Sequence, residues 1–399
     1  MTHSNKTIQL LKGKEKRIKD GHLWVFSNEI KPNEIVSEMG DVVRLMDANN
    51  NFLGTAFYHP NSLIALRVLS HQDTMIDESF FLRRLQKALS LRNKTIHNTD
   101  AYRLVHAESD MLPGLIVDCY NRGVVIQILS AGMEKQRHNV VNALKSLLNP
   151  IFIAFKNDHP MRQREGLTLY NELALGDKND IPIEVTENSV RYSIDPFDSE
   201  STGMYLSQRE HRKTLRQYIT KGDRVLDAFC HHAGFAINAA LGGASDVTAI
   251  DNSANAIEKA RYMVELNQLQ DSITTIQEDL KVSLPKMEKR KETFDVINLD
   301  PPDLALTRKN VGPALRQYRD FHGHAMKMLK PGGILATSCQ SLHISRAAFM
   351  DSILRACKDV KREVQLLHRG ENPADHPVKP EMPETDYLKF LVFQVNKPD

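Results

Sequence analysis

The sequence has no apolar run long enough to cross a membrane, and Met1 to Lys6 form no apolar signal segment. It has only four cysteines, and their scattered spacing fits neither a disulfide framework nor a zinc site. These absences predict a cytoplasmic protein with reduced thiols, no metal and no membrane partner. The formal net charge of +2 over 399 residues is too small to indicate a partner by itself.

The stretch from Asp223 to Asp251 predicts a strand, a tight turn, a helix and a second strand. It lacks the G-x-G-x-x-G turn that cradles a pyrophosphate, since the turn contains one glycine, Gly234. Asp227 ends the first strand and Asp251 the second, where acids reach a nucleoside in a doubly wound α/β fold. A nucleoside without phosphates, whose ammonium Asp227 attracts, fits S-adenosylmethionine better than NAD. An ordinary strand–helix–strand unit without a ligand is the alternative.

The length of the chain and the order of its predicted elements indicate three domains. Residues 1–72 are predicted to form short strands, and residues 73–182 a small mixed α+β domain. In residues 183–399 strands alternate with helices, which predicts a parallel sheet with right-handed crossovers and an antiparallel finish. The predicted fold class is therefore α/β, with a seven-stranded Rossmann-like sheet in the C-terminal domain.

Several local patterns predict where helices begin. Asp77 is placed to cap a helix over 79–92, and a single helix is predicted over 134–148. Polar loops are expected from a strand at 151–155 to about residue 180. Ser207 and Glu210 form a capping-box pattern, which predicts a helix that opens there and ends near Tyr218.

A third acid follows the third predicted strand of the C-terminal domain. Asp279, followed by Leu280, lies where a carboxylate accepts the N6 amino group of an adenine, and Asp251 with Asn252 is placed to bind the ribose. One such acid is a weak signal, because strands often end in Asp before a turn. Three acids at the ends of three consecutive strands indicate a nucleoside site more strongly.

The fourth strand of this domain is followed by Asp300-Pro301-Pro302-Asp303. The two prolines fix the backbone and remove two N–H donors, so free carbonyls are able to meet a flat substrate. Methyltransferases that modify exocyclic amino groups usually have an aromatic residue at the position of Asp303, so the sequence argues against that reaction. A plain turn at the end of a strand is the alternative.

Cys339 follows the fifth strand in a Ser/Thr-rich turn and is expected to face the pocket near Asp300. A lone cysteine is more often a buried small hydrophobe than a nucleophile. Its position nevertheless fits a cytosine C5 methyltransferase, in which thiolate addition to C6 makes C5 nucleophilic. Asp300 is the candidate for a protonated carboxyl group near N3, and a cation or a helix N-terminus would be needed to activate the thiol.

Basic residues gather near the N-terminus and after the Asp-Pro-Pro motif. A small β barrel with a basic rim grips RNA by shape and phosphate, and solvated surface is the alternative. Trp24, the only tryptophan, fits a core residue better than a platform for a base. The candidate substrate-binding residues are Lys12, Lys14, Arg17, Pro301, Pro302 and Arg308.

Over nearly its whole length the chain resembles the class I S-adenosylmethionine-dependent methyltransferases that make 5-methylcytosine in 23S rRNA. That family combines an N-terminal PUA domain, a central α+β domain and a C-terminal Rossmann-like catalytic domain. Taken together, the matching stretches are specific for this family. They are Leu11–Lys16, His22–Ser27, Glu108–Asp118, Ser201–Arg209, Val225–Cys230, Leu299–Pro302, Thr337–Cys339, Asp375–Pro377 and Pro383–Lys389.

The resemblance implies a PUA-like RNA-binding barrel, 23S rRNA as the substrate, free or in a precursor particle, and Cys339 as the residue that attacks the cytosine. It also suggests a homodimer. It assigns S-adenosyl-L-methionine to Gln208, Asp227, Phe229, Asp251, Asn252 and Asp279. Gly234, in the turn after the first strand, and Leu280, next to Asp279, complete the candidate cofactor set.

Three departures from the family pattern bear on these assignments. His231-His232-Ala233-Gly234 replaces a Tyr-Thr-Gly-Gly-like turn, and Ser207 replaces a common Asp, which affects cofactor affinity. Gln340 follows the thiol where a serine is common, which affects thiol activation or the target nucleotide. Two alternatives stay open: an rRNA methyltransferase for another base position, such as a guanine ring nitrogen, and a non-catalytic assembly factor that binds cofactor and RNA.

Overall fold

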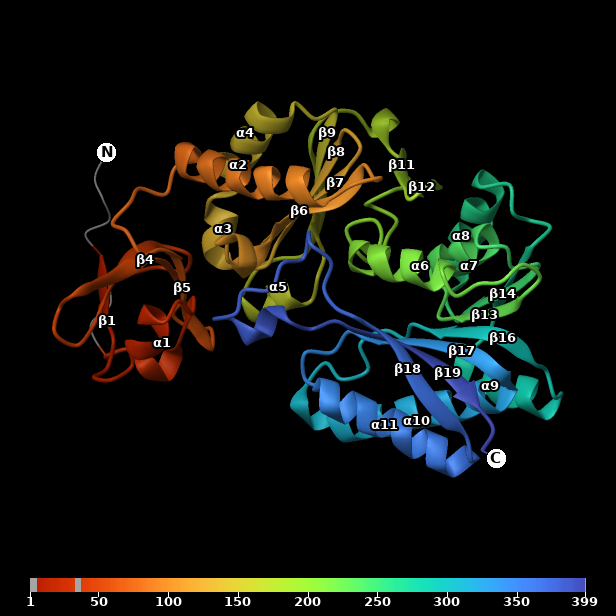
Figure 1. The fold of residues 1–399 in the computed structure, drawn as a ribbon. Coiled ribbons are helices and arrows are strands. Elements are labelled where there is room, and N and C mark those ends of the chain that lie inside the picture. The colour runs from red at the N-terminus through yellow and green to blue at the C-terminus, as the bar shows by residue number, and fades with distance from the viewer. Residues whose placement is uncertain (1–5, 33–36, 399) are drawn as a thin grey trace. The chain divides into compact units, whose positions relative to one another are not determined.

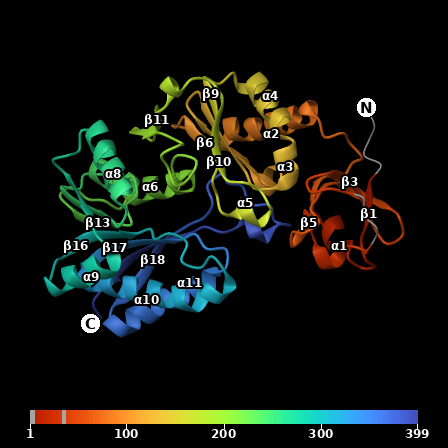
Figure 2. The same cartoon turned by 180° about the vertical axis from the view of Figure 1, so that it is seen from behind.

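The computed structural model describes residues 6–32 and 37–398, and the chain forms two compact units. The first unit holds the chain up to Thr186, together with Ser193–Leu206 and Ala374–Thr385. The second unit holds Glu187–Tyr192, Ser207–Pro373 and the chain from Asp386 onward. Each unit is therefore built from segments that are distant in the sequence (Figures 1 and 2). The predicted boundaries at residues 72 and 182 stay predictions.

The first unit begins with a five-stranded sheet in the order β1-β3-β4-β5-β2. β3 and β4 pair antiparallel, with Val43 opposite Ala56. Both residues are fully buried in the core of this sheet. The elements are β1 (Thr7–Gln9), α1 (Lys16–Lys19), β2 (Trp24–Phe26), β3 (Val42–Met46), β4 (Phe52–Tyr58) and β5 (Ile64–Ser70).

A second five-stranded sheet in the first unit has the order β10-β9-β8-β7-β6. The predicted cap of α2 is confirmed, since Asp77 Oδ1 accepts the Phe80 N–H at 2.9 Å. The elements are α2 (Glu78–Thr95), β6 (Ala101–His106), β7 (Leu115–Tyr120), β8 (Gly123–Ile128), α3 (Ala131–Lys135), α4 (Arg137–Leu148), β9 (Phe152–Asn157), α5 (Met161–Arg164) and β10 (Tyr170–Leu175). A two-stranded sheet follows, formed by β11 (Ile183–Glu187) and β12 (Val190–Ile194).

Two predictions for this region are wrong. The single helix predicted over 134–148 is interrupted at Gln136, whose N–H donates to the Met133 carbonyl and closes a turn between α3 and α4. The stretch predicted as polar loops contains α5 and the edge strand β10. β10 pairs only with β9 and its side chains are exposed or half-buried, so its sequence carries a weak hydrophobic signal.

The second unit contains a seven-stranded sheet in the order β15-β14-β13-β16-β17-β19-β18. Only β19 runs antiparallel to its neighbours, which confirms the α/β class and the antiparallel finish. Figure 1 shows α6, α7 and α8 on one face of the sheet and α9, α10 and α11 on the other. The helices are α6 (Arg209–Arg216), α7 (Gly234–Leu241), α8 (Ala254–Leu266), α9 (Leu280–Lys289), α10 (Val311–Met328) and α11 (Arg346–Val360). The strands are β13 (Arg224–Ala228), β14 (Asp246–Asp251), β15 (Ile273–Gln277), β16 (Phe294–Leu299), β17 (Leu329–Cys339), β18 (Glu363–Gly370) and β19 (Lys389–Asn396).

The carboxyl ends of four parallel strands meet at one edge of this sheet. Ala228 of β13 pairs with Ile250 of β14 and with Leu299 of β16, and Leu299 pairs with Thr337 of β17. The residues that come next in each strand therefore lie next to one another, at the edge where ligands bind in such folds. These residues are Phe229, Asp251, Asp300 and Ser338.

No helix in the described part of the chain is both long and apolar enough to span a bilayer. Among residues 6–32 and 37–398, no group of three or more His, Cys, Asp or Glu side chains is arranged to hold a metal ion. All four cysteines are free and buried.

Candidate cofactor and catalytic site

Asp227 lies at the end of β13 and its side chain is only 1% exposed. Its Oδ1 accepts a hydrogen bond from Asn298 Nδ2, and its Oδ2 accepts one from the Ala236 N–H in the first turn of α7, both at 2.9 Å. Burial, opposed by these two bonds, raises the pKa of Asp227 to about 7. The carboxyl group is thus held by neutral donors only, and a cationic ligand nearby would favour its charged form.

Asp251, at the end of β14, is partly exposed and fixes two loops at the same edge. Its Oδ2 accepts the His231 N–H and its Oδ1 accepts the Ser253 N–H, both at 3.0 Å. Asn252 follows it with an exposed side chain. The carboxylate therefore ties the loop after β13 to the start of α8, which sets its direction at the sheet edge.

The loop between β13 and α7 has a strained backbone. Phe229, His231 and Ala233 have φ values of 66°, 48° and 59°, in the left-handed region that non-glycine residues rarely adopt. Gly234 begins α7, and a Cβ there would lie 2.8 Å from the Cδ of Arg212. The loop therefore approaches the Arg212 side chain closely, and strain of this kind is typical of ligand-binding turns.

Asp279 follows β15 and lies at the exposed start of α9. Its Oδ1 accepts the Lys281 N–H at 2.9 Å, so it serves as the N-cap of this helix. Leu280 is buried at 1% exposure and belongs to the core. Of these two candidates, only Asp279 presents a polar group at the sheet edge.

Asp300 follows β16 and is the centre of a small polar cluster. Its Oδ1 accepts hydrogen bonds from Gln208 Nε2 at 2.7 Å, from Gln340 Nε2 at 3.4 Å and from the Ser338 hydroxyl. Burial, opposed by these donors and by Arg212, raises the pKa of Asp300 to about 6. Among the described residues all three side-chain bonds go to Oδ1 of Asp300.

Gln208 links Asp300 to α6. The capping box predicted at Ser207 and Glu210 is wrong, because α6 begins at Arg209, after a short 3₁₀ turn, and has no side-chain cap. The Gln208 side chain instead donates to Asp300 and meets His211 Nδ1 through its Oε1 at 2.6 Å. The first turn of α6 therefore positions an amide at the site instead of closing a capping box.

Cys339 is the last residue of β17, and its side chain is fully buried in the core cluster of the second unit. Successive residues of a strand point to opposite faces, and it is Ser338 that meets Asp300. The thiol interacts with the Tyr318 hydroxyl, the Ser341 N–H and Lys389. Burial raises the pKa of Cys339 above its ordinary value. The thiol is therefore covered in this structure and lies on the other face of β17 from Asp300.

Three polar residues at this edge were missed from the sequence. Asn298, two residues before Asp300, holds Asp227, and Ser338 holds Asp300. Arg212 forms a buried bidentate ion pair with Glu187, with distances of 2.8 and 2.7 Å. Asn298 had a sequence signal, since a polar residue inside an apolar strand needs a partner. The pair of Arg212 with Glu187 had none, because the two residues lie far apart in the chain.

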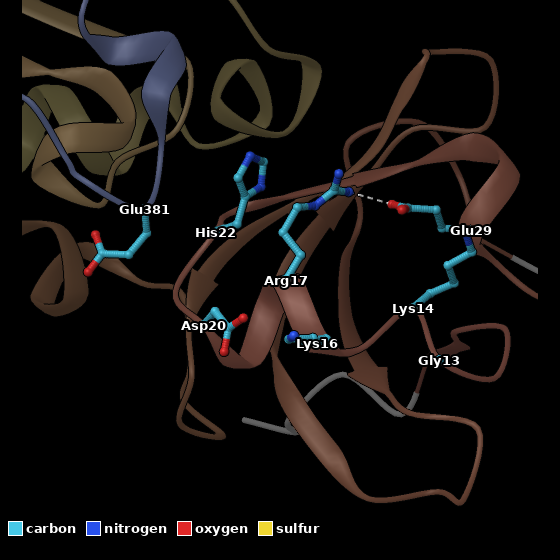
Figure 3. Close-up of a pocket in the computed structure, with 8 residues that line it drawn as sticks. All are labelled: Gly13, Lys14, Lys16, Arg17, Asp20, His22, Glu29 and Glu381. Carbon is cyan, nitrogen blue, oxygen red and sulfur yellow. Dashed lines mark hydrogen bonds and ion pairs between the residues drawn. The ribbon is translucent and has the colours of Figure 1, made fainter.

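The candidate RNA-binding residues fall into two groups. In the second unit, Pro302 and Arg308 are exposed and Pro301 is buried. In the first unit, Lys12 and Lys14 are exposed. Lys14 lines a cavity of about 570 Å³ together with Gly13, Lys16, Arg17, Asp20, His22, Glu29 and Glu381 (Figure 3).

Arg17 is engaged inside this cavity. Its Nη2 donates to Glu29 Oε2 at 2.6 Å (Figure 3). The same Nη2 donates to the Trp24 carbonyl at 3.2 Å. The indole N–H of Trp24 in turn donates to Glu108 at 2.9 Å, so Trp24 is not free to stack on a base. Lys14 and Lys16 are the exposed lysines that line this cavity, and the Arg17 side chain is bound to Glu29 and to the Trp24 carbonyl.

Two family models match the chain. Residues 8–71 match the PUA-like domain, and residues 164–394 match the S-adenosylmethionine-dependent methyltransferase. The second match covers more than half of the chain and contains the acids at the sheet edge. The fold and the site thus define an S-adenosylmethionine-dependent methyltransferase with a PUA-like domain, as predicted.

Curated relatives narrow this class. The chain is 37% identical over 396 residues to ribosomal RNA large subunit methyltransferase I of Erwinia tasmaniensis, a match that covers 98% of this chain and 100% of the relative. It is 38% identical over 392 residues to the protein of that name from Tolumonas auensis, covering 97% and 98%. The chain belongs to the family of ribosomal RNA large subunit methyltransferase I.

Solved structures agree on the fold. A SAM-dependent methyltransferase from Streptococcus mutans superposes with a TM-score of 0.83 at 21% identity, covering 98% of this chain and 100% of that chain. A methyltransferase complexed with SAH superposes with a TM-score of 0.84 at 22% identity and the same coverage.

Proposed function

We propose that the protein transfers a methyl group to C5 of a cytosine in large-subunit ribosomal RNA, with Cys339 as the nucleophile. The observation that carries the proposal is that Asp300 and Cys339 end the neighbouring parallel strands β16 and β17. Both lie at the edge that holds Asp227 and Asp251. The names of the relatives support ribosomal RNA as the substrate.

S-adenosylmethionine supplies the electrophilic methyl group. Asp227, with its raised pKa and neutral hydrogen-bond donors, is the residue that a ligand ammonium would convert to the charged form. Asp251 and Asn252 suit a ribose, and exposed Asp279 suits the adenine amino group. Phe229 lies edge-on to Phe321, with ring centroids 5.2 Å apart, and offers an apolar wall beside the loop.

The Cys339 thiolate adds to C6 and forms an S–C6 bond, which moves an electron pair of the ring onto C5. C5 would then take the methyl group as the bond between the methyl carbon and the cofactor sulfur breaks, with its electron pair staying on that sulfur. Loss of the C5 proton to a solvent base re-forms the C5–C6 double bond and breaks the S–C6 bond, so that the electron pair returns to the Cys339 sulfur. Asp300, protonated in part near neutral pH, donates from Oδ2 to N3 and offsets the charge that the addition places there.

The covered thiol has a consequence for this reaction. Ser341, two residues after Cys339, donates from its hydroxyl to the Ala305 carbonyl at 3.0 Å, which binds the turn after β17 to the segment after Asp300-Pro301-Pro302. A base must displace part of this cover before it meets the thiol. Base entry of this kind costs a few kcal/mol, less from unpaired RNA.

The burial of Cys339 also favours a second candidate, a ribosomal RNA methyltransferase that acts on another base atom, such as a guanine ring nitrogen, and needs no thiol. The charged, hydrogen-bonded Asp300 and its amide neighbours would suit a ring N–H as well. Mass spectrometry of nucleosides from modified rRNA distinguishes the two products.

The test is Cys339→Ala, with Cys357→Ala as the matched control in the same unit. We expect the Cys339 variant to lose methyl transfer to rRNA, read by bisulfite sequencing, while calorimetry shows unchanged affinity for S-adenosylmethionine. The control keeps both. Normal turnover by the Cys339 variant contradicts the thiol mechanism and leaves the second candidate. A homodimer and the choice between free rRNA and a precursor particle stay predictions.

A further inference from the structure

Two polar pairs connect α10 with β17 on the face that carries the Cys339 thiol. Thr337 and Cys339 share one face of the strand, and Tyr318 and His322 share one face of the helix. His322 Nε2 meets Thr337 Oγ1 at 2.9 Å, and Tyr318 interacts with the Cys339 thiol. The rings of Tyr318 and His322 stack, with centroids 6.0 Å apart.

The Tyr318 hydroxyl is an unpartnered donor. The side chain is 1% exposed, and within residues 6–32 and 37–398 the hydroxyl has no hydrogen bond of normal geometry. Leaving a buried hydroxyl in this state costs about 1–3 kcal/mol. A neutral thiol is a weak acceptor, whereas a thiolate is a strong one. The Tyr318 hydroxyl therefore lies beside a sulfur that would accept its hydrogen bond more strongly as a thiolate than as a thiol.

The turn after β17 adds a second donor. The Ser341 N–H lies close enough to the Cys339 sulfur to favour its thiolate form. The turn is fixed, because the Ser341 hydroxyl donates to Ala305 at 3.0 Å and accepts the His343 N–H at 3.2 Å. A backbone N–H held in this way costs no reorganisation when charge develops.

Lys389 supplies a cation. It pairs with Cys339 across the antiparallel strands β17 and β19, so the two side chains share a face of the sheet. Lys389 is 4% exposed, and its Nζ donates to the carbonyls of Ser341 at 2.5 Å and Tyr387 at 2.9 Å. An ammonium has three N–H groups, so these two bonds leave one for an anion.

The other charges around the thiol are few. Asp303, in the segment after β16, acts against a thiolate. Arg346 of α11 and Asp386 flank Lys389 and pair with each other at 2.8 Å. Lys389 is thus the cation whose charge is left to act on the sulfur.

We propose that the Tyr318 hydroxyl, the Ser341 N–H and the Lys389 ammonium form a site that stabilises the Cys339 thiolate. The proposal rests on the proposed function, in which the sulfur carries an electron pair before addition and again after elimination. On ionisation the thiol proton passes to solvent. Lys389 acts as a positioning residue, because its two carbonyl bonds hold the turn while its charge lies beside the sulfur.

The test uses Tyr318→Phe, Lys389→Gln and Lys389→Arg. Thiolate absorbance is titrated against pH in each variant, with the same variant carrying Cys339→Ser as its blank. We expect Tyr318→Phe and Lys389→Gln each to raise the pKa of Cys339 by about one, a tenfold loss of thiolate at a given pH, and Lys389→Arg to restore most of it. The acid limb of the pH profile of methyl transfer should move the same way.

If Tyr318 and Lys389 had a purely structural role, their replacement would lower stability and leave the thiol pKa unmoved. The proposal predicts a different result: Tyr318→Phe removes an unsatisfied group, so stability should hold or rise while thiolate formation falls. An unmoved thiol pKa and an unmoved acid limb in both Tyr318→Phe and Lys389→Gln overturn the proposal. If Cys339→Ala keeps methyl transfer, the proposed function fails instead, and the absorbance titration still reports whether the thiolate site exists.

Discussion

Asp118 in the first unit and Asp227 in the second are both almost fully buried, but they are held by different partners. Asp118 is 0% exposed and receives a bidentate hydrogen bond from Arg103, at 2.8 and 2.9 Å. Asp227 has only a side-chain amide and a backbone N–H. Asp110 in the first unit is held in the same way, because it accepts two hydrogen bonds from Arg92, at 2.6 and 2.7 Å. Asp300 repeats the pattern of the second unit.

The difference in partners indicates which carboxyl groups stabilise the fold and which belong to a functional site. A carboxylate paired with a buried guanidinium has its charge compensated and closes a structural network. A carboxyl group that is buried among neutral donors has its pKa raised toward neutrality, as at Asp227 and Asp300, and such groups cluster at functional sites. The second unit therefore bears a cost in stability that a bound ligand offsets.

The largest effect is expected from removing a buried carboxylate that is paired with an arginine. Asp118→Ala removes the carboxylate that accepts both hydrogen bonds of the Arg103 guanidinium and should destabilise the first unit by about 3–5 kcal/mol. Urea unfolding followed by the fluorescence of Trp24, the only tryptophan, reports on this unit. The matched control is Asp73→Ala, which removes an exposed pair with Arg44 and should cost about 0–1 kcal/mol. Equal losses in the two variants contradict the assignment.

The second prediction concerns pH. The pKa of Asp227 is raised to about 7 from 3.8, so the folded protein binds a proton that the unfolded chain releases between these values. Stability from this group is present below about pH 4 and is lost as the pH rises to 7, by up to roughly 4 kcal/mol. Asp300, raised to about 6, acts in the same direction.

Asp227→Asn removes this titration and should flatten the pH dependence of unfolding between pH 5 and 8, measured by circular dichroism without cofactor. The asparagine keeps one carbonyl acceptor but loses one of the two bonds, so the variant is less stable at low pH. Asp227→Asn/Asp300→Asn should be flatter still. A wild-type protein whose second unit gains stability over this range would refute the prediction.

The third prediction uses Asp300→Asn, where stability and activity should separate. The pKa of Asp300 is raised from 3.8 to about 6, so near pH 6 its titration lowers the stability of the folded protein by roughly 2–3 kcal/mol. The neutral asparagine should therefore leave the free energy of unfolding unchanged or raise it. Methyl transfer should fall about 100-fold or more, because the amide cannot move a proton at N3. Single-turnover assays with rRNA measure the loss, and full activity contradicts the role given to Asp300.

The sequence was sufficient for the parts of the site that follow from strand ends. Asp227, Asp251 and Asp300 were predicted at one edge because parallel strands present their carboxyl ends together, and the register confirms that edge. The helix α2 was predicted because Asp77 provides a local cap. Signals of this kind lie within a few neighbouring residues.

The rest depended on contacts between distant segments. The pairing of Arg103 with Asp118, and the contact of Asp375 with Arg103 from 272 residues away, have no local pattern. A capping box was predicted at Ser207 and Glu210, but α6 has no side-chain cap, and the Gln208 side chain donates to Asp300, which lies 92 residues away. The position of Cys339 was predicted, but its face was not, since one residue of register decides whether Ser338 or Cys339 meets Asp300.

The smallest effect concerns charges that the fold leaves in solvent. Lys12 and Lys14 are exposed in the PUA-like domain, and Lys14 lines its cavity, whereas Arg17 is paired with Glu29. Replacing both lysines by glutamine should leave stability unchanged, since neither forms part of a buried network. Each lysine that contacts a phosphate should contribute about 1 to the slope of log affinity against log salt.

Lys12→Gln/Lys14→Gln should therefore weaken binding of an rRNA fragment several-fold at moderate salt and lower that slope by about 2. Lys87→Gln/Lys94→Gln, on the exposed face of α2, removes the same charge from the same unit and is the matched control. Because long-range attraction depends on net charge, the control should also weaken binding slightly, but its slope should stay near that of the wild type. Equal slopes in the two double variants would mean that the N-terminal lysines do not contact the RNA.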